Sequence, residues 1–299
     1  MGFARFFSCA VGILVAAQTL AGCDRNTSPI VPQGLNPQAN ARDALLYVSD
    51  TATNSVSIYS YPRLKLTGKL TIKRPAGLCV DPRTGNVWVV SELSPEIIEF
   101  PHGGTKRMHT LDLGYGFQGC AVDASGNLAV ARYNDYDDAG ALFIFKNGRG
   151  KPTIYENQKM FYYEFVGYDS NGNAFVDGEW NAKLEELPAG GKKLKNVTPN
   201  GVTLTSPGGV QYDGTNLAVG NAKRGVIYQV SGRTIVGKMT LNGACVVEQF
   251  FIDAERGDVI APSRCHSKGE VLIYDYPAGG NPIKRIAGFR DPFAAVVSR

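Results

Sequence analysis

Histidine and tryptophan are scarce in this sequence of 299 residues, which has three of the first and two of the second. His102, His109 and His266 are far apart and fall in different parts of a repeat described below, so a metal site built on several histidines is not expected. The sequence also contains no Walker A motif, no G-x-S-x-G, no C-x-x-C and no H-E-x-x-H. These absences count against P-loop NTPases, α/β-hydrolases, thioredoxin-like redox proteins and zincin metalloproteases.

Charged residues are also few, at 19%, and the two signs nearly balance to a formal net charge of +4. So weak and dispersed a charge does not favour a nucleic-acid partner. Apolar residues make up 43% of the chain, which is enough to form a core and excludes a disordered protein. The chain has 35 Gly and 16 Pro, a composition that does not suit a coiled coil or a helical bundle.

The N-terminal segment has the layout of a secretory signal peptide. A single charge, Arg5, precedes an uncharged stretch from Phe6 to Cys23. The stretch is barely long enough to span a bilayer, and an uncleaved membrane anchor is the alternative. Its last residues, Leu-Ala-Gly-Cys (20–23), resemble the lipobox of bacterial lipoproteins. The resemblance implies a signal peptide over 1–22, a lipid on Cys23, and a protein of the cell envelope that faces the periplasm or the exterior.

Residues 24–42 show no apolar periodicity and are rich in Pro, Asn and Gln. Such a segment is typical of a flexible tether, with a root-mean-square reach of about 25 Å. The sequence therefore predicts three parts: the signal peptide, a lipidated cysteine with its tether over 23–42, and a folded domain over 43–299. On this prediction, the membrane is a partner through the lipid anchor.

The folded domain repeats one pattern, in which a short apolar strand, an Asp, a Gly-containing turn and a second apolar strand follow one another. The repeated aspartates, spaced 40 to 46 residues apart, are Asp81, Asp123, Asp169, Asp213 and Asp253. Asp accepts hydrogen bonds from backbone amides two residues further on and Gly accepts positive φ, so each unit predicts a β-hairpin. A third strand and a more polar fourth strand follow in each unit. Four strands per period of about 43 residues indicate a β-propeller blade.

The ends of the domain predict how the ring closes. The segment DPFAAVVS (291–298) is similar to an innermost strand, whereas DALLYVSD (43–50) is similar to a second strand. Joined in one sheet, they complete the sixth blade and leave no open edge there. The predicted fold is therefore an all-β six-bladed β-propeller whose closing blade contains strands from both ends.

Two segments carry a resemblance to known propellers. YVSDTATNSVSIYSYP (47–62) is close to the YVTN repeat, and PAGLCVDPRTGNVWV (75–89) resembles an NHL or SMP-30-like blade. Residues 43–299 thus resemble the NHL/YVTN/SMP-30-like superfamily of six-bladed propellers. That superfamily includes hydrolases, lyases, ligand binders and protein-interaction platforms, so the resemblance implies a fold without fixing an activity.

A candidate site follows from the repeat, because the residue five positions before each repeated position should lie at one end of the central channel. These residues are Ala76, Gln118, Glu164, Gly208, Glu248 and Phe293. Phe293 precedes Ser298, which takes the place of the repeated Asp in the closing blade. The oxygens of Gln118, Glu164 and Glu248 suit a ligand or a hard cation such as Ca²⁺, Mg²⁺ or Mn²⁺. The SMP-30 resemblance implies a metal held by Glu164 or Glu248, with Asn221 or Asp177 beside it. The alternative is a solvated rim.

The segments between second and third strands should open on the same end. They carry polar and aromatic residues of the kind found at recognition surfaces, and the candidates are Arg132, Tyr133, Asp177, Trp180 and Asn221. A simple solvated loop is the alternative interpretation for each of them.

Four cysteines lie in the folded domain. Cys245 precedes the innermost strand of one blade and Cys265 follows the second strand of the same blade, so a disulfide is expected in an oxidising compartment. Cys79 and Cys120 lie in innermost strands of neighbouring blades and are offset by one residue. Since successive side chains of a strand point to opposite faces, these two are expected to face apart and to remain small buried apolar residues.

The function that the sequence favours is that of a monomeric, lipid-anchored binding platform without enzymatic activity. Its partner would be a protein, a glycan or a small ligand on the face that carries the candidate residues, and nucleic acid is not expected. The alternative is a metal-dependent hydrolase of the lactonase kind, which requires Ca²⁺, Mg²⁺ or Mn²⁺.

Overall fold

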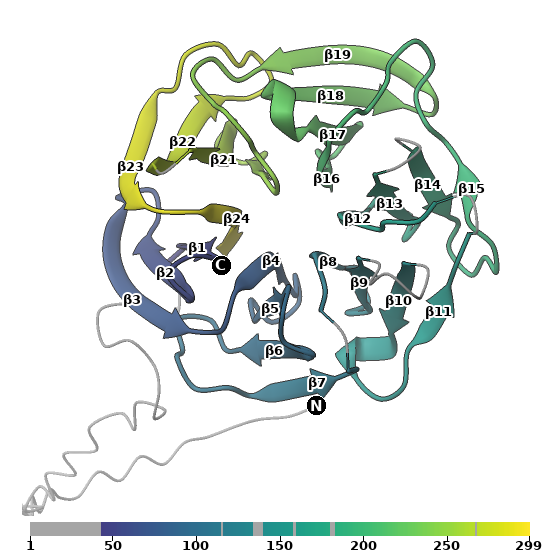
Figure 1. Ribbon diagram of the computed structural model, residues 1–299, viewed down its shortest axis with the longest axis horizontal. Helices are drawn as coiled ribbons and strands as arrows, with labels where there is room; N and C mark the ends of the chain where they lie inside the picture. The colour runs from purple at the N-terminus through teal and green to yellow at the C-terminus, as the bar shows by residue number, and fades with distance from the viewer. Residues whose placement is uncertain (1–42, 115, 134–139, 158–159, 180–182, 267) are drawn as a thin grey trace, which may run out of the picture. The chain divides into compact units, whose positions relative to one another are not determined.

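A computed structural model describes residues 43–299 except 115, 134–139, 158–159, 180–182 and 267. These residues form six four-stranded antiparallel sheets arranged around a central axis, the six-bladed β-propeller that the sequence predicts (Figure 1). Two short 3₁₀ turns are also present, η1 (Lys146–Gly148) and η2 (Ala222–Arg224). Within the described part of the chain there is no helix that is both long enough and apolar enough to cross a membrane.

Each blade runs from an innermost strand at the axis to an outermost strand at the rim. Blade 1 contains β24 (Pro292–Ser298), β1 (Leu45–Asp50), β2 (Ser55–Ser60) and β3 (Lys65–Thr71). Blade 2 contains β4 (Pro75–Val80), β5 (Val87–Ser91), β6 (Glu96–Phe100) and β7 (His109–Asp112). Blade 3 contains β8 (Gly119–Val122), β9 (Leu128–Arg132), β10 (Ala141–Phe145) and β11 (Thr153–Tyr155).

The remaining blades follow the same order. Blade 4 contains β12 (Val166–Tyr168), β13 (Ala174–Gly178), β14 (Lys183–Leu187) and β15 (Lys195–Asn196). Blade 5 contains β16 (Pro207–Tyr212), β17 (Leu217–Asn221), β18 (Val226–Ser231) and β19 (Thr234–Thr240). Blade 6 contains β20 (Phe251–Asp253), β21 (Asp258–Cys265), β22 (Lys268–Asp275) and β23 (Lys284–Phe289).

The ring closes in blade 1, where the last strand of the domain pairs with the first. β24 runs antiparallel to β1, with Ser298 opposite Leu45 and Pro292 opposite Asp50. All seven residues of β24 are buried. The predicted closure by strands from both ends of the domain is therefore confirmed.

Strand burial follows from the stacking of the blades. Second strands such as β5 and β9 are buried at every position, because each sheet has a neighbouring sheet against both faces. Outermost strands such as β19 instead alternate between exposed and partly buried residues, as expected for strands at the rim. The sequence signal is correspondingly a short, continuous apolar run for the second strands and a polar pattern for the fourth.

The two faces of the ring differ in the connections that they carry. The segments leading into innermost strands and those between second and third strands lie at one end of the sheets, which we call the top face. The turns between first and second strands and between third and fourth strands lie at the other end, which we call the bottom face. The described chain begins on the bottom face, because Leu45 pairs with Ser298 at the end of β24.

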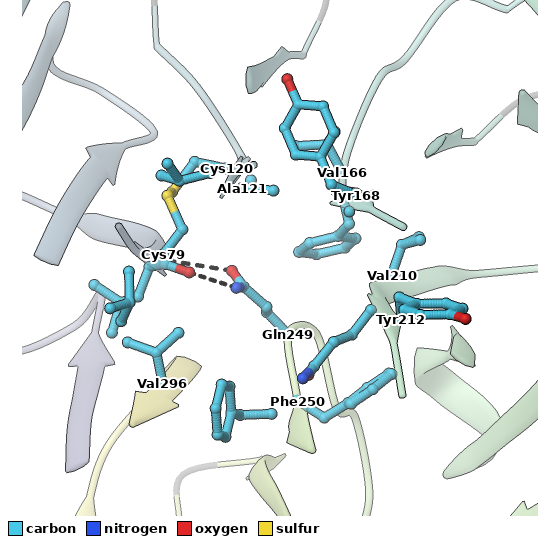
Figure 2. Close-up of a pocket in the computed structure, with 18 residues that line it drawn as sticks. Cys79, Cys120, Ala121, Val166, Tyr168, Val210, Tyr212, Gln249, Phe250 and Val296 are labelled. Carbon is cyan, nitrogen blue, oxygen red and sulfur yellow. Dashed lines mark hydrogen bonds between the residues drawn. A yellow bond between two sulfur atoms is a disulfide. The ribbon is translucent and has the colours of Figure 1, made fainter. Parts of the chain in front are cut away.

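Innermost strands approach one another closely at the axis. A Cβ atom at Gly119 would lie 2.6 Å from the carbonyl oxygen of Glu164, so only glycine fits there. Below this constriction the strands enclose a channel cavity of about 190 Å³ lined mostly by apolar side chains. Figure 2 shows the Gln249 side chain inside it, where the amide donates to the Leu78 carbonyl at 2.6 Å and accepts from the Leu78 N–H at 3.2 Å.

The expectation for Cys79 and Cys120 is wrong, because these residues form a disulfide with their Cα atoms 5.6 Å apart (Figure 2). The alternation of side chains along a strand applies within one sheet, whereas β4 and β8 belong to two sheets that face each other. A side chain that points forward from blade 2 therefore meets one that points backward from blade 3. The one-residue offset brings the two sulfur atoms together rather than apart.

Cys245 and Cys265 form the disulfide expected from their places in blade 6, with a Cα–Cα distance of 5.2 Å. The N–H of Cys245 also donates to the Ser263 hydroxyl at 3.0 Å. The bond fixes the segment that leads toward β20 onto the end of β21. It lies on the top face, beside the candidate site.

Candidate functional site

A cavity of about 400 Å³ lies on the top face, around the segments that lead into the innermost strands. We call it the top cavity and define it by Gln118, Tyr133, Glu164, Lys223, Glu248 and Arg264. Glu92, Leu93, Glu179 and Ser206 also contribute to its wall. Its residues come from blades 2 to 6, so the cavity forms only when these five blades are arranged around the axis.

The structure brings together four of the predicted site residues and separates the others. Gln118, Glu164 and Glu248, each five positions before a repeated Asp, line the top cavity, and Tyr133 joins them. Trp180 lies outside the described residues. The other three candidates are buried near strand ends and do not line the top cavity: Arg132, Asp177 and Asn221.

The three buried candidates have structural contacts instead of exposed positions. Arg132 is the last residue of β9 rather than the first residue of a loop, and its guanidinium lies 5.5 Å from the centre of the Phe143 ring. Asn221 ends β17, and its side-chain amide approaches the carbonyl of Thr203 at 3.4 Å. The expectation that these side chains form an exposed recognition surface is therefore wrong.

Asp177 accepts hydrogen bonds from the backbone of the segment that carries Glu164. The N–H of Phe165 donates to its Oδ1 at 2.9 Å, while its Oδ2 has no hydrogen-bond partner among the described residues. The Glu164 N–H donates to the backbone carbonyl of Asp177 at 2.9 Å. Complete burial raises the pKa of Asp177 well above its usual range. Asp177 thereby holds the Glu164–Phe165 segment in place.

Glu164 is a neutral acid within the wall of the top cavity. Its side chain is almost fully buried, and this desolvation, together with the nearby Asp177, raises its pKa to about 10. At pH 7 the protonated carboxyl therefore offers both a hydrogen-bond donor and an acceptor without a charge. Burial at this position costs less in the neutral form than in the charged form.

Glu248 lies in the same wall but has a cation beside it. Burial raises its pKa to about 7, although Arg264 opposes the shift. Arg264 binds the Glu248 carboxylate at 2.7 Å and reaches Asp291 with its other terminal nitrogen at 3.2 Å. The top cavity thus combines a neutral acid and a carboxylate paired with a cation, and the charged residues Glu92, Glu179 and Lys223 also line it.

The rim of the top cavity carries exposed apolar surface on blades 2 to 4. Leu93 and Tyr133 line the cavity and are 63% and 39% exposed. The Tyr133 ring stacks on the Tyr162 ring, with their centres 4.5 Å apart and an interplanar angle of 22°. Large apolar side chains that stay exposed beside a polar cavity are typical of a binding surface.

The divalent cation implied by the SMP-30 resemblance does not fit these residues. Among the side chains that the structure describes, no group of three or more His, Cys, Asp or Glu is placed to hold a metal ion. The carboxylate of Glu248 is engaged by Arg264, and burial keeps Glu164 protonated. Asp177 and Asn221, the expected companions, do not line the top cavity.

Sequence reasoning missed Glu92, Leu93, Glu179, Ser206, Lys223 and Arg264, although Glu179 and Lys223 lie close to the candidates Asp177 and Asn221. Glu92 and Leu93 lie between the second and third strands of blade 2, so the rule applied to the other blades would have found them. Arg264 could not be found in that way, because it lies within β21, which runs unusually far toward the top face. Ser206 directly precedes β16 and carries no signal of its own.

Comparisons with known proteins show the fold alone. No protein-family model and no curated protein matches the chain. A protein of unknown function from Bacteroides caccae is similar in structure, with a TM-score of 0.68, 13% identity, and coverage of 86% of this chain and 99% of that one. A chain in the crystal structure of a nidogen/laminin complex has a TM-score of 0.68 and 14% identity, covering 86% and 98%. A functionally unknown protein from Desulfotomaculum acetoxidans has a TM-score of 0.59 and 8% identity, covering 85% and 99%.

The ionisation of Glu164 predicts how stability depends on pH. Its pKa is 4.5 in the unfolded chain and about 10 in the folded one, so between these values only the folded protein holds the proton. The free energy of unfolding therefore falls as pH rises through this range. Glu164→Gln removes the ionisation, and we expect the variant to gain about 2 kcal/mol over the parent between about pH 5 and pH 7.

Urea unfolding at several pH values measures this gain. Glu255→Gln, at an exposed position on the bottom face, is the control and should keep the pH dependence of the parent. Parallel curves for Glu164→Gln and the parent would mean that Glu164 is ionised in the folded protein.

Proposed function

We propose that the protein is a binding platform whose top cavity takes a neutral, hydroxyl-rich ligand of the glycan class. The observation that carries the proposal is the stacked Tyr133–Tyr162 pair beside a cavity in which Glu164 is protonated and Glu248 is paired with Arg264. The C–H face of a sugar ring packs on an aromatic face, and its hydroxyls both donate and accept hydrogen bonds.

The polar groups of the cavity support a neutral rather than a charged ligand. The Glu164 carboxyl is protonated, and Glu248 and Arg264 neutralise each other. Gln118 adds an uncharged amide that can donate and accept. A charged ligand that competes for Glu248 or Arg264 would break their pair, which costs more in a part-buried site than at the surface.

Calorimetric titration with a panel of neutral oligosaccharides tests the proposal. Tyr133→Ala should weaken the binding of any hit by about tenfold, because a central aromatic contact contributes more than about 1 kcal/mol. Val236→Ala is the matched control, since Val236 is an exposed apolar residue on the outermost strand β19. Absence of heat with every oligosaccharide, or equal affinities for parent and Tyr133→Ala, would contradict the proposal.

The cellular setting belongs to the same proposal: a lipoprotein of the cell envelope, anchored through Cys23. Two disulfides in the folded domain support an oxidising compartment, since stable disulfides are rare in the cytosol. Incorporation of labelled fatty acid into the parent but not into Cys23→Ser would support the anchor. Undiminished incorporation in the variant would contradict it.

A further inference from the structure

The bottom face carries a concentration of positive charge in the turns between third and fourth strands. In five of the six blades these turns contain Lys or Arg, and in none of the six do they contain Asp or Glu. The exposed basic residues of these turns are Arg63, Lys106, Arg107, Lys146, Arg149, Lys151, Lys192, Lys193 and Arg233. We call the four lysines of this set on blades 3 and 4, Lys146, Lys151, Lys192 and Lys193, the lysine surface.

The acidic residues of the bottom face do not cancel this charge, because most of them are turned into the fold. Asp123 accepts from the N–H groups of Ser125 and Asn127 at 2.9 and 2.7 Å, within its own turn. Asp169 makes the equivalent contacts in blade 4. The carboxylates of Asp123 and Asp169 thus serve as turn caps, whereas the four lysines are exposed to solvent.

The described chain begins on the same face. The described chain starts at Asp43, whose carbonyl lies 3.0 Å from His102 Nε2 in the β6–β7 turn of the bottom face. Asp43, to which a tether from Cys23 would connect, therefore lies on the face that carries the basic turns. The top cavity, in contrast, opens on the other face.

We propose that the bottom face docks on anionic phospholipid headgroups through the lysine surface, so that the top cavity faces away from the bilayer. A basic protein surface and a lipid chain are two independent membrane signals, and together they give stable attachment where one is marginal. The propeller contributes its own electrostatic affinity, and this affinity does not require the lipid anchor.

Vesicle co-sedimentation tests this with the propeller alone, residues 43–299, which contain all the strands of the closed ring. We expect binding to vesicles of phosphatidylglycerol and phosphatidylcholine in equal amounts, and none to pure phosphatidylcholine. The binding should disappear at high salt, since screening removes attraction between exposed charges. Replacing the four lysines of the lysine surface by Gln should weaken binding by at least about tenfold.

The matched control removes the same number of charges from other exposed positions, at the top end of the sheets. Lys73, Arg224, Lys268 and Arg290 are exposed there, and replacing these four by Gln should leave most of the vesicle binding intact. Circular dichroism and melting curves of both variants verify that they are folded. Oligosaccharide titration of the top cavity is independent of this assay, so failure here leaves the proposed ligand binding untouched.

Three results would overturn the proposal. Equal binding to neutral and anionic vesicles would remove the electrostatic basis. If the lysine-surface variant and the control variant lost equal amounts of vesicle binding, the binding would depend on net charge and not on the bottom face. Tighter, lysine-dependent binding to a short DNA duplex than to the anionic vesicles would assign the surface to a different polyanion.

Discussion

A chain that lacks residues 291–299 will fail to form a stable monomeric propeller. The deletion removes β24, the innermost strand of blade 1, and leaves β1 without its partner. Phe293, Val296 and Val297 are buried. The loss of their burial alone lowers the free energy of unfolding by about 6 kcal/mol. That amount is comparable to the whole stability of an ordinary domain, which is about 5–15 kcal/mol.

The polar contacts of β24 increase the expected loss. The N–H of Gln249 donates to the Phe293 carbonyl at 3.1 Å, and the N–H of Ala294 donates to Ser49 Oγ at 3.0 Å. Arg299 binds the buried Asp253 carboxylate at 2.7 Å, so the deletion would leave that carboxylate without its cation. A partner group left unpaired in a buried site costs more than the contact itself contributes.

Thermal unfolding and size-exclusion chromatography of the truncated protein measure this effect. Adding a synthetic peptide of residues 291–299 should restore part of the melting transition, because the vacant strand position is specific for that sequence. Val296→Ala provides a milder change that keeps the strand and should cost about 1–2 kcal/mol. A truncated protein that stays monomeric and melts within a few degrees of the parent would refute the role of β24 in closing the ring.

Replacing both Cys79 and Cys120 by Ala will lower the free energy of unfolding by about 4 kcal/mol. The bond joins residues 41 positions apart, and the chain-entropy argument gives a larger effect for a longer closed segment. The pair also joins the innermost strands of blades 2 and 3 in the wall of the channel cavity. The Cys245–Cys265 bond, with a separation of 20, should contribute about 3 kcal/mol by the same argument.

Urea unfolding of the two double variants, each with the other disulfide intact, separates the contributions. Peptide mapping under non-reducing conditions should recover Cys79 linked to Cys120 and Cys245 linked to Cys265. Free thiols at Cys79 and Cys120 in the folded parent would contradict the first pairing. Equal stability of the parent and the Cys79/Cys120 variant would contradict its energetic role.

The sequence was sufficient to predict the fold and the meeting of three candidate residues in one cavity, because both follow from counting along a regular repeat. The repeated Asp fixes where each first strand ends, and the position five residues earlier fixes the top of the channel. Gln118, Glu164 and Glu248 meet in one cavity for this reason. The pairing of β24 with β1 follows from the same count, since each end of the domain lacks the strands that the other supplies.

The contacts between blades could not be predicted in the same way. The repeat gives the order of strands within one sheet but not how two sheets face each other, and the Cys79–Cys120 bond depends on that packing. Polar residues at strand ends are equally ambiguous. Whether Arg132 or Asp177 faces a cavity or the interior depends on whether the strand continues by one residue, which composition does not reveal.

The pairing of β24 with β1 also has a consequence for the biogenesis of the protein. β24 follows every other strand of the ring in the chain, whereas its partner β1 precedes them all. During synthesis, β1 therefore emerges first, and its edge stays uncovered until all the remaining blades have been made. An uncovered strand edge is a template for pairing with other chains, so the nascent protein needs a chaperone or rapid passage to avoid aggregation until its last strand arrives.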